Sequence, residues 1–107
     1  MRVVHGKLVR DGVPAILDER HVTYLARTAS EGEVAALLAA KLVEEALEVA
    51  RANRDEMLDE LADVLEVAEA LASRFGFTSS AVEARRQIRR AQRGGFDRAV
   101  VLEWTED

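Results

Sequence analysis

Apolar residues recur every three to four positions along three long stretches of the chain, which is the spacing of an α-helix. Two of the stretches open on a serine followed three positions later by a glutamate, the pattern of a capping box: Ser30-x-x-Glu33 and Ser80-x-x-Glu83. Glycines follow the last two stretches and would end them. The pattern therefore predicts three long helices, over residues 30 to about 53, 54 or 55 to about 75, and 80 to about 93.

The segments outside these helices are short. Asp11 is a candidate cap for a short helix over Ala15–Arg20, with Pro14 near its first turn. Residues 21–27 suit a short strand or a loop, and residues 96–104 suit a short terminal strand or an extended tail. We therefore expect an all-α fold, an antiparallel helix bundle with short extended N- and C-terminal segments. A chain of 107 residues is one domain, residues 1–107.

The first long helix carries acidic residues in unequal positions. At 100° per residue, Glu45 falls inside an apolar arc that includes Leu38, while Glu48 and Lys41 lie at its edge. Glu44 points away from this arc and is expected to face water. A second apolar stripe lies on the opposite side of the helix: Ala36, Ala39, Val43 and Leu47. A helix that is apolar on two sides usually packs on two sides, so we expect a subunit interface.

The second long helix repeats the arrangement. Glu60 falls within its apolar arc and Asp63 lies at the border, three positions on and therefore on the same face. Antiparallel packing through the two arcs would bring together four carboxylates: Glu45, Glu48, Glu60 and Asp63. Buried carboxylates are costly unless they are neutralised, and oxygen-only ligands suit Mg²⁺ or Mn²⁺ better than zinc.

The carboxylates have two other interpretations. In the first, Glu45 and Glu60 are ion-paired with Lys41 and nearby arginines, with no metal involved. A di-iron bundle would need a Glu-x-x-His motif on two helices, and both histidines lie outside the long helices, which excludes it.

Charge is distributed unevenly along the chain. The formal net charge is −5, yet residues 44–69 hold ten acidic side chains and residues 85–98 hold six arginines. These are either two solvated helix faces that attract each other, or a cation site and an anion site in one pocket. The acidic total argues against binding of a nucleic-acid polymer. No apolar run is long enough to span a membrane, and no apolar signal core opens the chain, so we expect no membrane partner. The absence of cysteine excludes disulfide and iron–sulfur scaffolds and fits a cytoplasmic location.

Two acidic motifs and two end motifs resemble a known superfamily. Residues 44–48 read EExxE, and residues 60–63 read ExxD twelve positions after Glu48. With KLVRDGVP at residues 7–14 and RGGF at residues 93–96, they are similar to the MazG-like all-α nucleoside triphosphate pyrophosphohydrolases. The closest likeness is to a small subgroup described as phosphoribosyl-ATP pyrophosphohydrolase-like, and it covers nearly the whole chain.

The resemblance implies a metal-dependent activity. Members bind magnesium through the positions that correspond here to Glu45, Glu48, Glu60 and Asp63, and they cleave a nucleotide between its α- and β-phosphates. They also assemble as dimers or tetramers. Magnesium is thus the expected cofactor, with manganese as a possible substitute.

The expected reaction assigns catalytic and phosphate-binding roles to two of the glutamates and to several basic residues. Glu45 or Glu48 is the candidate for orienting or deprotonating the attacking water, and Lys41 would stabilise charge on the phosphates. The candidate phosphate contacts are Lys7, Arg10, Arg89 and Arg93. For each of these arginines, a solvated helix face is the favoured interpretation over a phosphate contact. For Gly94-Gly95, a plain helix stop is favoured over backbone N–H groups that meet a phosphate.

The predicted function is a magnesium-dependent pyrophosphohydrolase that converts a non-standard or damaged nucleoside triphosphate to the monophosphate and pyrophosphate. The alternatives are a phosphoribosyl-ATP pyrophosphohydrolase and a non-catalytic module that binds a nucleotide or a protein. The few aromatic residues do not identify a base.

Overall fold

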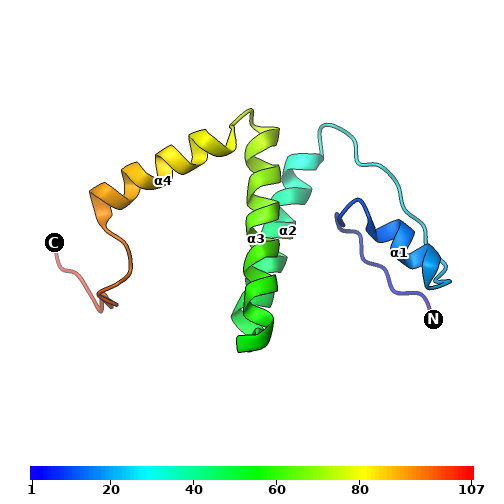
Figure 1. Cartoon of the computed structure of the whole chain (residues 1–107), viewed down its shortest axis with the longest axis horizontal. Coiled ribbons are helices and arrows are strands. Elements are labelled where there is room, and N and C mark those ends of the chain that lie inside the picture. Colours follow the sequence, from blue (N-terminus) through cyan, green and yellow to red (C-terminus); the bar gives the residue numbers. More distant parts are fainter.

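The computed structural model describes residues 1–107 and confirms an all-α fold with no strand (Figure 1). Its four helices are α1 (Val13–Glu19), α2 (Val34–Arg51), α3 (Arg54–Arg74) and α4 (Ser79–Arg93).

The helices α2 and α3 pack side by side and form the centre of the structure (Figure 1). Only Ala52 and Asn53 separate them, so we call the pair the α2–α3 hairpin. Asn53 closes a complete capping box: its side chain accepts from the Glu56 N–H, and the Glu56 carboxylate accepts from the Asn53 N–H, both at 3.0 Å. This cap satisfies backbone N–H groups that a helix start otherwise leaves unpaired. It fixes where α3 begins and therefore which side chains the two helices bring together.

The other helix starts differ from the sequence expectation. At Ser30-x-x-Glu33 only half of a capping box forms, because the Glu33 carboxylate accepts from the Ser30 N–H at 2.9 Å while the Glu33 N–H donates to the Ser30 carbonyl. A turn precedes the helix, and α2 begins at Val34. Before α4 the cap is Thr78 rather than Ser80, because the Thr78 hydroxyl accepts from the Ala81 N–H.

The segments outside the three long helices contain one short helix, and the rest is irregular. The first helix begins at Val13, two positions earlier than predicted, and no side-chain cap from Asp11 forms. Residues 21–27 form a loop, residues 96–99 form a turn closed by the bond from the Ala99 N–H to the Phe96 carbonyl, and residues 100–104 form a tail without strand pairing. At the end of α4, Gly94 adopts a φ of 82°, which ends the helix as predicted.

A single chain leaves much of its apolar surface uncovered. Only Leu38 and Val67, which face each other inside the hairpin, are buried. The helix α4 leads away from the hairpin and contacts only α3 (Figure 1). The radius of gyration is 18.0 Å, against about 13 Å for a compact chain of this length. Large apolar side chains remain mostly exposed on α3 and on the tail, among them Leu58, Leu65, Phe96 and Val101.

Candidate metal centre

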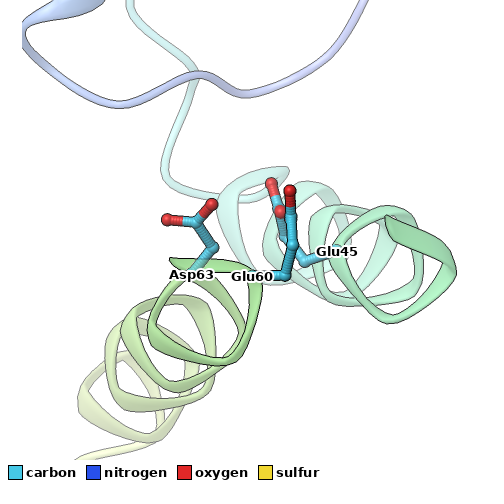
Figure 2. Close-up of side chains that lie close together, drawn as sticks. All are labelled: Glu45, Glu60 and Asp63. Carbon is cyan, nitrogen blue, oxygen red and sulfur yellow. The ribbon is translucent and has the colours of Figure 1, made fainter. Parts of the chain in front are cut away.

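Three carboxylates meet on one side of the α2–α3 hairpin. Glu45 comes from α2, and Glu60 and Asp63 come from α3. One oxygen from each lies within 4.8 Å of the others, and all three residues are half-buried. Figure 2 shows the three side chains projecting from the two helices to the same side. We call these three residues the carboxylate cluster.

The spacing from the turn explains why these residues meet. Glu45 lies seven positions before Ala52, and Glu60 lies seven positions after Asn53. Seven residues are close to two helical turns, so both side chains fall at the same level of an antiparallel pair. The two buried residues are also equally spaced from the turn, but by twice as many residues. Leu38 lies fourteen positions before Ala52, and Val67 lies fourteen positions after Asn53. One register therefore forms the apolar contact and the carboxylate cluster together.

The fourth predicted carboxylate lies at the margin of this group. Glu48 is exposed and is not among the three residues whose oxygens come together. The negative charge of Glu48 nevertheless contributes to the raised pKa of Glu60, so the two carboxylates interact electrostatically.

Two members of the cluster already have cationic partners. The Lys41 ammonium lies 3.4 Å from Glu45 and 3.5 Å from Glu44, and its side chain is only 15% exposed. The Arg10 guanidinium donates to Asp63 at 2.7 Å. Glu60 has neither an ion pair nor a side-chain hydrogen bond. The ion-pair interpretation of the sequence thus applies to Glu45 but not to Glu60.

The surroundings of Glu60 disfavour its charged form. Burial raises the pKa of Glu60 above its ordinary value, and the neighbouring carboxylates, first Asp63 and then Glu48 and Glu45, raise it further. A half-buried acid without a partner, beside other acids, is stabilised by any cation that reaches it. Because every donor here is a carboxylate oxygen, the set fits a hard divalent cation such as Mg²⁺ or Mn²⁺.

The helical wheel predicted that Glu44 faces water, but the structure places it against the N-terminal segment. It accepts a hydrogen bond from the Lys7 ammonium at 2.5 Å, and its side chain is 33% exposed. This contact lowers the pKa of Glu44 below its ordinary value. The helical wheel of α2 could not reveal it, because Lys7 lies 37 positions earlier in the chain.

Arg89 and Arg93 do not approach the carboxylate cluster of their own chain. The helix α4 starts beside α3, where the Ser79 hydroxyl donates to the Glu69 carboxylate. From there α4 extends away from the hairpin (Figure 1). Arg93 lies fourteen residues further on, about 21 Å along the helix axis at 1.5 Å per residue.

The fold and the cluster together describe a helical chain with clustered carboxylates that could hold a metal ion. A family model described as phosphoribosyl-ATP pyrophosphohydrolase matches residues 9–90. The chain belongs to this family, which is part of the MazG-like all-α nucleoside triphosphate pyrophosphohydrolase superfamily. Neither the comparison with curated proteins nor the comparison with solved structures gave a significant match. None of the four helices combines the length and the apolar character needed to cross a bilayer.

Proposed function

We propose that the protein is a divalent-cation-dependent pyrophosphohydrolase that cleaves a non-standard or damaged nucleoside triphosphate to the monophosphate and pyrophosphate. The observation that carries this proposal is the convergence of Glu45, Glu60 and Asp63 within 4.8 Å on two packed helices. Membership of the family supports the reaction class, hydrolysis of an acid anhydride. A purely structural role for the cluster would leave Glu60 unpaired among like charges, which has no stabilising purpose.

The ligands of the cation in this proposal are Glu45, Glu60 and Asp63, with Glu48 completing the set from the margin. A bound Mg²⁺ or Mn²⁺ would neutralise the triphosphate and align it for in-line attack. Glu48 is the better placed of the two candidate bases, because it is exposed to the solvent that supplies the water. Glu45 instead faces Lys41. Lys41 itself would donate to phosphate oxygens as negative charge develops on the leaving pyrophosphate.

The remaining phosphate contacts come from two basic segments. Lys7 and Arg10 already lie against the hairpin that bears the cluster. Arg89 and Arg93 would reach a carboxylate cluster only from another copy of the chain. The uncovered apolar residues of α2, Val43 and Leu47, support assembly into a dimer or tetramer, as does the large exposed apolar surface elsewhere.

The direct test incubates the protein with Mg²⁺ and a panel of standard and modified nucleoside triphosphates, and identifies the products. Monophosphate plus pyrophosphate is expected. Glu60→Gln should lower kcat by about 100-fold or more, since it removes the ligand that has no other partner. Asp59→Asn is the matched control, because Asp59 is the exposed acidic neighbour of Glu60 and lies outside the cluster. Products of diphosphate plus phosphate, or equal loss in both variants, would contradict the proposal.

Phosphoribosyl-ATP is the second candidate substrate, and the name of the matching family is the observation that favours it. The panel should therefore include it at the same concentration as the triphosphates. A kcat/KM for phosphoribosyl-ATP at least tenfold above every triphosphate would assign the chain to that reaction. The opposite ranking would support a role in clearing unwanted nucleotides, for which a cytoplasmic location is expected.

A further inference from the structure

We infer that the segment of residues 7–10, the N-terminal strap, occupies the cation site with its own positive charge and leaves it when a divalent cation binds. This inference rests on the proposed metal site and goes beyond it, because it assigns Arg10 a role in the protein without metal. In that state the Arg10 guanidinium neutralises Asp63. Once displaced, Arg10 and Lys7 become available to an anionic substrate.

The strap spans both helices of the hairpin at the level of the cluster. Lys7 binds Glu44 on α2, and Arg10 binds Asp63 on α3. The other guanidinium nitrogen of Arg10 lies 3.9 Å from Glu66, one turn further along α3. Figure 2 shows the N-terminal segment crossing the side of the hairpin toward which the three carboxylates point. The strap is therefore attached by charge, and at the position where a ligand would enter.

Arg10 and a divalent cation cannot both occupy Asp63 at full strength. The guanidinium donates to Oδ1 of Asp63 at 2.7 Å, so it already neutralises part of the negative charge that would attract a cation. Two positive charges sharing one carboxylate also repel each other. Arg10 must then weaken or give up this contact when the cation binds, and its contact must equally weaken cation binding, because such coupling is reciprocal.

The exposure of the pair sets the size of the effect. Arg10 is 54% exposed and Asp63 is 40% exposed, so solvent screens their attraction. Exposed pairs of this kind change an equilibrium by at most about fivefold. The strap is thus weak enough to be displaced by millimolar cation and strong enough for its removal to be measured.

The test is a calorimetric titration of the metal-free protein with Mn²⁺, without nucleotide. Arg10→Ala should bind Mn²⁺ about two- to fivefold more tightly than the wild type, while Arg10→Lys should stay near the wild type. Arg27→Ala is the matched control, since it also removes one positive charge and breaks an ion pair, with Glu33 at 2.8 Å, but away from the cluster. It should leave the affinity unchanged.

A second readout follows the strap itself. The NMR order parameters of the backbone amides of residues 7–11 should fall when the diamagnetic Mg²⁺ is added to the wild type, and should not respond in Glu60→Gln at the same concentration. Equal Mn²⁺ affinity in the wild type and Arg10→Ala, or weaker binding by Arg10→Ala, would overturn the strap inference and leave the metal site intact. Absence of Mn²⁺ binding in the wild type and in Arg10→Ala would overturn the proposed metal site, and the inference with it.

Discussion

Two basic segments of this chain have opposite surroundings. At the N-terminal end, Lys7 and Arg10 each contact an acid of the α2–α3 hairpin. On α4, by contrast, Arg85, Arg89 and Arg93 make no ion pair, Arg86 pairs with Glu83 of its own helix, and Arg90 lies 3.9 Å from Asp97 just beyond the helix. Lys7 and Arg10 therefore contact acids of distant helices, whereas the basic side chains of α4 have local partners or none.

Apolar burial divides the molecule in the same way. Both buried residues, Leu38 and Val67, lie in the hairpin, whereas α4 buries none of its side chains. The difference teaches that one chain buries the contact between the two hairpin helices but buries no part of α4. Several arginines of α4 have no acidic partner, and its apolar residues are uncovered. The hairpin of another copy is acidic and has an exposed apolar face, so it would offer both.

The largest expected difference concerns apolar truncation. Leu38→Ala should lower the free energy of unfolding by about 2–3 kcal/mol, because Leu38 is only 7% exposed and its removal leaves a cavity between the helices. Ile88→Ala on α4 should cost less than about 1 kcal/mol in a single chain, since Ile88 is 50% exposed. Urea unfolding followed by circular dichroism measures both.

The same pair of variants can break the comparison. A cost for Ile88→Ala that approaches that of Leu38→Ala, and that grows with protein concentration, would mean that a second copy covers α4. Equal and concentration-independent costs would mean instead that α4 packs within its own chain.

A smaller difference is expected for the helix caps. Asn53→Ala removes the capping-box bond that the Asn53 side chain accepts from the Glu56 N–H in the hairpin turn, and it should cost about 1 kcal/mol of global stability. Thr78→Ala removes the single cap bond of α4 and should reduce helicity there while the unfolding midpoint of the hairpin stays in place. Hydrogen exchange resolved by segment separates the two effects. A lower midpoint in Thr78→Ala would show that α4 and the hairpin unfold as one unit.

The smallest expected difference is in pH dependence. The Arg27 guanidinium lowers the pKa of Glu33 to about 2, and the Arg86 guanidinium does the same for Glu83. A folded-state pKa below the ordinary value of 4.5 stabilises the fold above pH 4.5, and this contribution is lost as the pH falls toward 2. Glu33→Gln should therefore reduce the difference in Tm between pH 6 and pH 3.

Glu83 provides the comparison for this measurement. Its partners lie within α4, so Glu83→Gln should lower the helicity of α4 at pH 6 without changing the pH dependence of the main unfolding transition. An equal change in both variants would again indicate that α4 is coupled to the hairpin.

Much of the fold could be predicted from the sequence because it depends on local signals. The periodicity placed the three long helices within a few residues, and Gly76 and Gly94 end helices as expected. The caps were harder, because several neighbouring serines and threonines compete for the same role. Thr78 was selected over Ser80 because its hydroxyl meets the Ala81 N–H, a geometry that the sequence pattern does not specify.

The sequence alone determined, through helical periodicity, that Glu45 and Glu60 lie in apolar arcs and Asp63 at the border of one. The two-residue turn that brings the three carboxylates to one level was shown by the structure. Which cations face these acids was decided only by the tertiary structure. Lys41 lies four positions before Glu45 on the same helix, so a helical wheel could predict their contact. The contacts of Lys7 with Glu44 and of Arg10 with Asp63 join residues 37 and 53 positions apart. Such contacts depend on the path of an irregular segment, which no local periodicity encodes.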